Sequence, residues 1–429
     1  MRPFRVTTEF RAGRSAVIGT TLLALLGFAH ACHAQSACRH CGWKATTTPR
    51  AVSVRTTAEL DRAVNNVLEG TTILLQDGTY RLNRMLDLAK SNVVLRSQSG
   101  DRTKVILRGE GMHESQVGVA VSISASNIIV ADMTIGNVGY HGVQVRGEKG
   151  VHGVVLHNLH VHDTGQQLVK GSVGDNGRFS ESVLVACSSF EYADHALSDY
   201  TNGVDVLGGR RWTVRDNRFR NIRGPRERNY AAGPAILFWR DCRDTLIARN
   251  IVVDCFRGIS LGLVPAGTKP AASGETYYDH QRGMVCNNVV CNLQPWGDEG
   301  IEANAAKDAR IEHNTVFVEG SLPWSIGIRF PSCNALVRNN LTNRPIVERD
   351  AAHMIAKGNV TDARRNWFLD AASGNLRLAE GTSNAIDAGV EIAPDAAIPE
   401  LASDLAGKLR APGSKPDAGA FEYSADRAK

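Results

Sequence analysis

The feature that most constrains this chain is a repeat of short β-branched runs, each followed by a polar corner. Eight runs, from IIVADMTI to ALVRNNLT, align on an apolar anchor, and successive anchors lie 26 to 38 residues apart. The anchors are Val130, Leu156, Val185, Val214, Ile247, Val285, Ile311 and Val337. A recurring period with apolar positions on both sides of a polar corner predicts one solenoid turn per repeat.

The corners themselves carry a second signal. Three residues after the anchor, five successive repeats have an asparagine: Asn217, Asn250, Asn288, Asn314 and Asn340. Asparagines scattered in ordinary turns are the alternative, but five at one offset make that a poor explanation. We therefore expect a stacked ladder whose side-chain amides bond the corner's backbone and one another.

A further strand follows each corner, in runs such as GVDV and GIEA. Strand alternation sends one set of polar residues outward, and we place Lys170 with them. The set is Gln144, Asp205, Ser260, Glu302 and Arg329. Because adjacent coils lie about 4.8 Å apart, neighbours in such a column can touch.

The first 34 residues have the pattern of an export signal. Four arginines precede the apolar run 16–29, which is too short to span a bilayer, and small residues follow it. We predict cleavage after Ala31 or Ala34 and a secreted, periplasmic or cell-surface protein. A buried helix is the alternative, and a lipid anchor on Cys32 stays open. No later apolar run is long enough for a membrane span.

Composition and charge limit the partners. With 43% hydrophobic and 22% charged residues, the chain is a folded, soluble protein rather than a disordered one. Its formal net charge of +5 comes mostly from the arginines of the export signal. No basic stripe with interleaved aromatics occurs, so nucleic acid is not an expected partner. We expect a monomer.

Cysteine spacing leaves the pairing open. Eight cysteines follow Cys32, an even number that is compatible with disulfides in an exported protein. Cys38 and Cys41 form a CRHC motif. A local disulfide is favoured over zinc, because no second CxxC supplies the remaining ligands.

Near the N-terminus, residues 56–70 predict one amphipathic helix, with Thr56 and Glu59 as a capping box. From there to residue 350 the repeat pattern resembles the right-handed parallel β-helix superfamily, which includes pectate, alginate and chondroitin lyases, polygalacturonases and mannuronan epimerases. The helix and the following TTILLQDGTY are similar to that superfamily's N-terminal cap. Residues such as GNLRLAEGTSNAIDAG and PDAGAFEY are similar to the tails of exported bacterial members.

The resemblance implies an all-β solenoid, a right-handed parallel β-helix with an N-terminal capping helix. The domains expected are a signal peptide (1–34), a Cys-containing segment (35–55), the β-helix (56–350) and a C-terminal capping tail (351–429). It also implies a polysaccharide as substrate or ligand. The lyases' usual catalytic motifs are not intact, so the site is sought among the residues themselves.

Long insertions indicate where a groove could lie. The segments 224–234 and 265–282 interrupt the repeat and would wall a groove. Near them we predict the catalytic residues, a base with its tuning carboxylate, a cation and hydrogen-bonding loop residues. They are Lys170, His195, Tyr200, Asp205 and Arg257. The head group of Lys170 is expected to face solvent.

Further polar residues would bind the substrate: His162, Asp163, Glu191, Arg220, Arg223, Glu302 and Arg329. For each of these, a solvated ladder pair without function is the alternative. A metal site is suggested by the run of His157, His160, His162 and Asp163. Strand alternation, however, points the His157 side chain in a different direction from some of the others. We predict no metal ligands, and the cofactor stays open, with calcium as the candidate. Trp239, Trp296 and Trp324 are possible sugar platforms, with Trp239 expected to face inward.

Three function classes compete. A lyase acting on a uronate polysaccharide is favoured, since Lys170 or His195 could supply its base and an arginine could neutralise the uronate carboxylate. A glycoside hydrolase needs two carboxyl groups about 5 to 9.5 Å apart. Asp205 and Glu302 would be three coils and about 14 Å apart, whereas Asp163 and Glu191 could meet the requirement. A non-catalytic carbohydrate-binding or surface protein is the third class.

Overall fold

The computed structural model describes residues 48–113, 116–264, 278–380, 384–393, 395–410 and 415–424. The predicted export signal, Cys32 and the CRHC motif lie outside these residues. No helix in the described ranges is long and apolar enough to cross a membrane.

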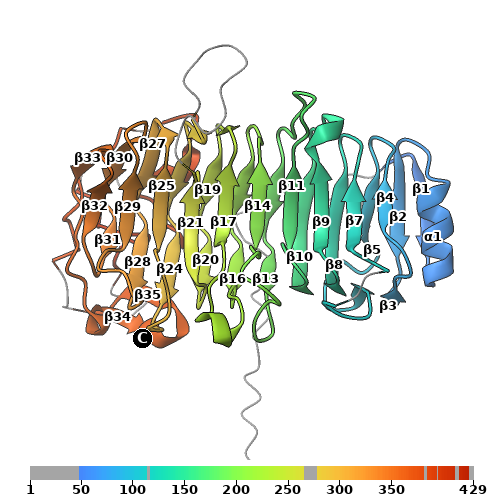
Figure 1. Ribbon diagram of the computed structural model, residues 1–429, viewed down its shortest axis with the longest axis horizontal. Helices are drawn as coiled ribbons and strands as arrows, with labels where there is room; N and C mark the ends of the chain where they lie inside the picture. The colour runs from blue at the N-terminus through green and yellow to red at the C-terminus, as the bar shows by residue number, and fades with distance from the viewer. Residues whose placement is uncertain are drawn as a thin grey trace, which may run out of the picture. The chain divides into compact units, whose positions relative to one another are not determined.

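Stacked parallel strands build most of the chain (Figure 1). The sheet that carries the predicted outward column, called sheet B, has ten strands, one from each coil: β4 (Leu86–Leu88), β7 (Val119–Ile123), β9 (His141–Arg146), β11 (Val169–Ser172), β14 (Val204–Leu207), β17 (Pro234–Trp239), β21 (Arg257–Leu261), β25 (Ile301–Asn304), β29 (Ile326–Arg329) and β32 (Ile346–Arg349). Each strand pairs in parallel with its equivalent in the next coil.

A larger sheet, sheet A, holds the strands on both sides of the polar corner. The strands before the corner are β1 (Arg50–Val54), β2 (Thr71–Leu75), β5 (Val94–Ser97), β12 (Leu184–Ala186), β15 (Thr213–Arg215), β19 (Leu246–Ala248), β23 (Met284–Cys286), β27 (Ala309–Glu312), β30 (Asn334–Arg338) and β33 (His353–Lys357). Those after it are β3 (Gly78–Arg81), β6 (Val105–Arg108), β13 (Ser189–Glu191), β16 (Arg218–Arg220), β20 (Ile251–Val253), β24 (Val289–Asn292), β28 (Thr315–Val318) and β31 (Leu341–Thr342). Two long strands run through the corner, β8 (Ile129–Val138) and β10 (Val155–Thr164).

Three short strands form sheet C: β18 (Cys242–Arg243), β22 (His280–Gln281) and β26 (Ala306–Lys307). Sheets A, B and C are parallel throughout, and crossovers between parallel strands are almost always right-handed. The predicted fold class, a right-handed parallel β-helix, is confirmed.

The asparagine ladder closes the corner of sheet A. Asn288 Oδ1 accepts the backbone N–H of Asn250 at 2.9 Å and its side-chain amide at 3.0 Å, and Asn288 donates to Asn314 in the same way. All five predicted members take part, and Asn359 extends the ladder by one coil. The residue before each of the five predicted asparagines has a φ between 53° and 59°. This left-handed residue turns the chain, so the ladder satisfies backbone groups that the turn leaves unpaired.

We expect Asn288→Ala to lower the free energy of unfolding by about 2 kcal/mol, because buried donors on Asn250 lose their acceptor. Chemical denaturation measures the change. Asn83→Ala, at an exposed asparagine, is the matched control, and it should stay within about 0.5 kcal/mol of the parent. Equal losses in the two variants would contradict a ladder role.

The coil boundaries are wider than 56–350. β1 pairs with β2 ahead of the helix, and β33 pairs with β30 beyond residue 350. The helix α1 (Thr57–Asn65) buries Leu60 and Val64 against the first coil and ends before the predicted residue 70. One half of the predicted capping box is confirmed, since Thr56 Oγ1 accepts the Glu59 N–H at 3.2 Å. Glu59 in turn accepts the backbone N–H of Arg55 at 2.8 Å.

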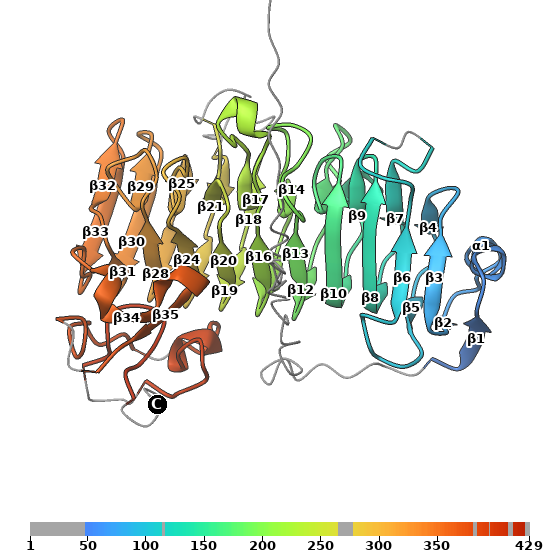
Figure 2. The same cartoon turned by 90° about the horizontal axis from the view of Figure 1, so that it is seen from below.

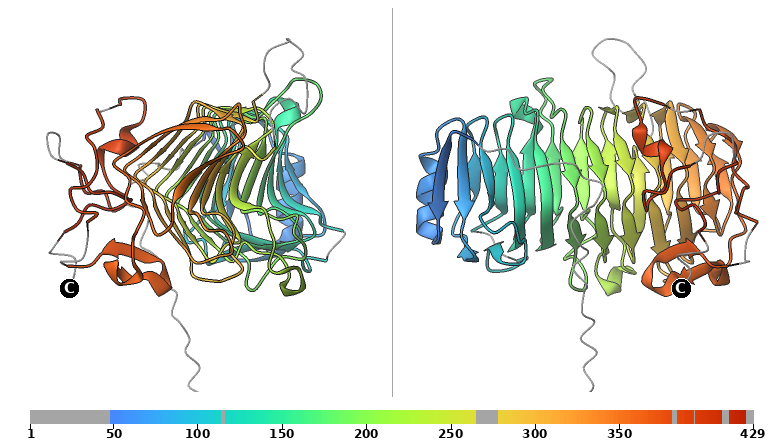
Figure 3. Two further views of the ribbon diagram at one scale, coloured as in Figure 1. Left: turned by 60° about the vertical axis from the view of Figure 1, so that its left-hand side comes forward. Right: turned by 180° about the vertical axis from the view of Figure 1, so that it is seen from behind.

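The C-terminal tail covers a side of the coils. Figures 2 and 3 show it beside sheet A, not over the last coil. It contains the antiparallel strands β34 (Phe368–Asp370) and β35 (Asn375–Leu378) and the short 3₁₀ segments η3 (Arg365–Trp367), η4 (Ala371–Ser373) and η5 (Pro399–Ala402). Outward apolar residues of sheet A pack against the tail. These are Val289, Cys291, Phe317 and Leu341. The tail thus packs against sheet A, and the contacts of sheet B come from other residues.

Most of the cysteines in the described residues are buried thiols. Cys187 is disulfide-bonded. Cys242, Cys255, Cys286, Cys291 and Cys333 are buried free thiols. Burial raises the pKa of Cys255 and of Cys291 to about 12, so these thiols stay protonated.

Candidate functional site

The predicted outward column exists in sheet B. Strand pairing places these residues side by side on successive coils: Gln144, Lys170, Asp205, Leu237, Ser260, Glu302 and Gly327. Lys170 therefore lies in register with Asp205, as expected. Arg329 belongs to the next outward column, against Asn304.

Around Lys170, four side chains form what we call the lysine cluster: Lys170, Asp205, Tyr200 and Trp239. Lys170 Nζ lies 2.5 Å from Asp205 Oδ2, and the Trp239 indole N–H donates to Asp205 Oδ1 at 2.8 Å. The Tyr200 ring centroid is 5.7 Å from Nζ. The Lys170 and Asp205 side chains are only 10% and 2% exposed. The expectation of a solvent-facing ammonium is wrong, because these neighbours cover it.

One member of this cluster and one neighbour of it are exposed to solvent. Tyr200 is 54% exposed, and the guanidinium of Arg240, also exposed, lies 4.9 Å from the Trp239 ring. His141, at the start of β9, is the other titratable neighbour. Burial and the charge of Lys170 lower the pKa of His141 to about 4, so its imidazole is neutral at physiological pH.

The expectation that Trp239 faces inward is wrong. Ile236 and Phe238 are fully buried in the core of the solenoid. Alternation from these two residues sends Leu237 and Trp239 outward. Reading the strand from Phe238 would have predicted the tryptophan's contact with Asp205.

Two predicted catalytic residues lie elsewhere. Arg257 is on β21, two coils or about 10 Å beyond Asp205, and its Nε contacts Asp298 at 2.5 Å. His195 Nδ1 donates to the carbonyl of Ala196 at 2.8 Å, and its Nε2 is 3.5 Å from Asp194. The structure therefore brings together Lys170, Tyr200 and Asp205 of the predicted set.

Arg257 belongs to a second group on sheet B, which we call the glutamate cluster: Arg257, Asp298, Glu299, Glu302 and Arg349. Glu299 Oε2 lies 3.4 Å from an Arg349 nitrogen, and Glu302 Oε2 accepts from Asn304 at 2.8 Å. The Arg349 guanidinium lies 4.5 Å from the Trp324 ring. The cluster thus joins three acidic groups to two guanidinium groups.

Its two glutamates are buried and only partly bonded. Glu299 is 5% and Glu302 8% exposed, and the Oε1 atom of each has no hydrogen-bond partner in the described chain. Burial, with the charge of Glu302, raises the pKa of Glu299 to about 8, although Arg349 opposes the shift. Burial also raises the pKa of Glu302 against the pull of Arg257.

Sequence reasoning missed Glu299. Its carboxyl group occupies the space above Gly327, where a Cβ atom would come within 1.7 Å of Glu299 Oε1. The available signal was this glycine at an outward position of the GIRF run, which leaves room for a side chain from another coil.

Four of the predicted binding residues, His162, Asp163, Glu191 and Arg220, lie on sheet A instead. His160 Nε2 and Glu191 Oε1 are 2.9 Å apart, as are His162 Nδ1 and Asp163 Oδ2. The hydrogen bond from His160 lowers the pKa of Glu191 despite burial. Burial acts to raise the pKa of Asp163, but bonds from His162 and the Ala193 N–H outweigh it. Both carboxylates are ionised at neutral pH, which does not suit the proton donor of a hydrolase.

Arg223, Arg329 and Glu302 complete the predicted set. Arg223 pairs with Asp194 at 3.0 Å, and its guanidinium lies 5.2 Å from the Tyr230 ring and 5.5 Å from the Trp296 ring. Arg329 pairs with Asp350. Of the residues predicted to bind substrate, Glu302 belongs to the glutamate cluster, which also contains the predicted catalytic residue Arg257.

No group of three or more His, Cys, Asp or Glu side chains within the described ranges is arranged to hold a metal ion. Burial lowers the pKa of His157 to about 4. The described residues therefore contain no cluster of acidic side chains arranged to bind calcium. Residues 265–277 of the insertion 265–282 are not among the described residues.

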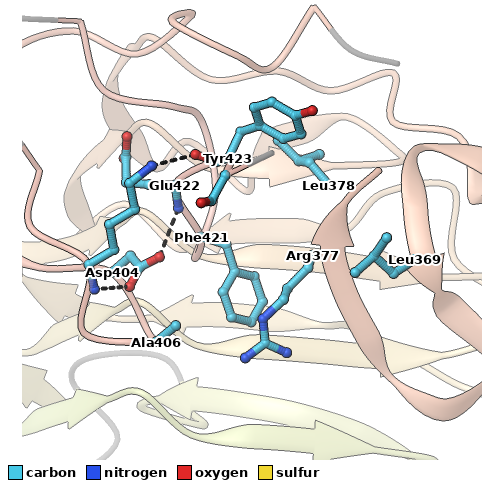
Figure 4. A pocket seen from close by; sticks show the side chains of 10 residues that line it. Leu369, Arg377, Leu378, Asp404, Ala406, Phe421, Glu422 and Tyr423 are labelled. Atoms are coloured by element: carbon cyan, nitrogen blue, oxygen red, sulfur yellow. Dashed lines mark hydrogen bonds between the residues drawn. The ribbon is translucent and has the colours of Figure 1, made fainter. Parts of the chain in front are cut away.

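A small hollow of about 20 Å³ lies in the C-terminal tail (Figure 4). Arg377 packs on the Phe421 ring at 4.7 Å, and Asp404 accepts the N–H groups of Lys408 and Glu422. Its polar groups satisfy one another, so the hollow belongs to the packing of the tail.

Comparison with known proteins finds distantly similar solved structures. No protein-family model and no curated protein matches the sequence. An alginate lyase from Paenibacillus sp. strain FPU-7 is 14% identical with a TM-score of 0.45, over 73% of this chain and 99% of that one. The pectate lyase Pel9A is 14% identical with a TM-score of 0.45, over 85% and 90%. The catalytic domain of a GH87 α-1,3-glucanase is 11% identical with a TM-score of 0.42, over 74% and 70%.

Proposed function

We propose that this protein acts on a uronate-containing polysaccharide along the outward face of sheet B and cleaves it by β-elimination at the lysine cluster. The observation that carries the proposal is the buried Lys170–Asp205 pair beneath exposed Tyr200 and Arg240. An amine positioned by a carboxylate suits proton abstraction. The N-terminal export pattern favours action outside the cytoplasm.

The reaction begins with removal of the proton beside the uronate carboxylate. The electron pair of that C–H bond forms a carbon–carbon double bond, the glycosidic C–O bond breaks, and the leaving oxygen takes up a proton. Lys170 Nζ must be neutral to accept the first proton. Asp205 Oδ2, at 2.5 Å, holds the Lys170 amine in position toward that proton.

The cation that neutralises the uronate carboxylate differs from the one expected. Arg257 is held by Asp298 two coils away. Arg240 is exposed and stacked on Trp239, which itself bonds Asp205. We therefore assign the role to Arg240, with the exposed face of Tyr200 as a hydrogen-bonding wall.

The test is incubation of the purified protein with pectate, alginate and glycosaminoglycan panels while the ultraviolet absorbance of unsaturated products is followed. Rising absorbance that requires Lys170 supports the proposal. New reducing ends without that absorbance would indicate a hydrolase. Binding without cleavage of any polymer would indicate a carbohydrate-binding or surface protein, and either outcome would overturn the lyase assignment.

A further inference from the structure

We propose that the glutamate cluster is a second site on sheet B, which binds the carboxylate of a uronic acid through carboxyl O–H groups together with guanidinium groups. The choice of a uronic acid as the ligand rests on the proposed function. The second site adds a binding step controlled by protons, separate from the lysine cluster, since Glu302 lies four coils or about 19 Å from Lys170.

The two carboxyl groups are close neighbours. Glu302 pairs in register with Gly327, and the carboxyl group of Glu299 occupies the space above Gly327. One coil spacing of about 4.8 Å therefore separates the two groups. Two ionised carboxylates at this distance repel strongly when water is excluded, so one or both hold a proton. A protonated carboxyl group donates a hydrogen bond.

A hydrogen bond with Ser260 acts to lower the pKa of Glu302, but one oxygen of each glutamate has no partner among the described residues. Glu299 Oε1 and Glu302 Oε1 are both buried and unbonded among the described residues, and a buried polar group without a partner is costly. Natural proteins break this rule mainly at functional sites. A carboxylate oxygen from a ligand would accept from the carboxyl groups.

The charge of the cluster selects an anion. With both glutamates protonated, Arg257 and Arg349 stand against Asp298 alone, which leaves one positive charge uncompensated. When both glutamates ionise, acidic groups outnumber the guanidinium groups and repel an anion. The other charged groups nearby, Arg329 and Asp350, neutralise each other, while Ser260 and Asn304 contribute neutral walls. The raised pKa of Glu299 is consistent with this reading.

Monosaccharides test the site without interference from cleavage, because they contain no glycosidic bond. Galacturonate, glucuronate and mannuronate, each beside its neutral sugar, are titrated into the intact protein at pH 6 and pH 9 by calorimetry or ligand-observed NMR. We expect at least one uronate to bind about tenfold more weakly at pH 9, and its neutral counterpart to show no change.

Two variants assign the effect to the cluster. Glu299→Gln keeps a hydrogen-bond donor but cannot ionise, so the uronate should bind about equally at both pH values. Gly327→Ala displaces the Glu299 carboxyl group by its Cβ atom and should weaken uronate binding at pH 6. Glu110→Gln, at an exposed glutamate, should behave like the parent.

The outcomes separate this inference from the proposed function. Unchanged pH dependence in Glu299→Gln, or no pH-dependent uronate binding by the parent, would overturn the second site even if polymers are cleaved. Proton-dependent binding without cleavage would support the second site and overturn the lyase assignment.

Discussion

Replacing Lys170 with alanine is expected to reduce polysaccharide cleavage at least about a hundredfold, since general-base catalysis contributes that much or more. The same change should lower the free energy of unfolding by about 3 kcal/mol. The loss arises because the carboxyl group of Asp205, whose side chain is 2% exposed, loses its Lys170 partner and retains only the Trp239 bond. Initial rates and chemical denaturation measure the two effects.

A second variant separates catalysis from folding. Lys170→Met combined with Asp205→Leu removes both charges, so most of the lost stability should return while cleavage stays absent. Lys149→Ala, at an exposed lysine, is the matched control and should change neither quantity. Full activity in Lys170→Ala would exclude Lys170 as the base. Inactivity of the stable double variant, by contrast, would show that lost activity is not a consequence of unfolding.

Glu299→Gln is expected to stabilise the protein increasingly as pH rises. The folded pKa of Glu299, about 8, lies above its ordinary value of 4.5, so the folded chain keeps a proton that the unfolded chain releases. Stability is therefore lost as pH rises from about 4.5 to 8. Above pH 8 the cost reaches up to about 5 kcal/mol, and glutamine avoids it.

Melting temperatures of the parent and variant at pH 5, 7 and 9 test this expectation. The two curves should nearly coincide at pH 5 and separate toward pH 9, whereas Glu110→Gln should follow the parent at every pH. A variant that is less stable than the parent by the same amount at all three pH values would instead mean that Glu299 is an ionised partner of Arg349.

The two sites differ in how their residues could be found. Lys170 and Asp205 belong to equivalent positions of neighbouring repeats, so aligning the repeats predicted their contact. Glu299 comes from the loop before β25, outside the repeat. Arg257 is in a repeat position, but its partner Asp298 is also a loop residue. A periodic pattern carries no information on where such a loop side chain turns.

The sequence by itself determined the solenoid, its polar corner and the register of the outward column. It could do so because each coil hydrogen-bonds only to the next, and one repeated set of side chains specifies every interface. The histidine and carboxylate pairs of sheet A show the limit of that logic, since equivalent spacing did not reveal that they lie on a different face from Lys170.

Only the tertiary structure decided which outward residues are buried and what they bond. Trp239 and Tyr200 cover the Lys170–Asp205 pair, Glu299 fills the space above Gly327, and the tail covers apolar residues of sheet A. These contacts are made by loop and tail segments that differ in length and do not follow the repeat. Their geometry depends on packing and charge among residues far apart in the chain, and local patterns do not encode it.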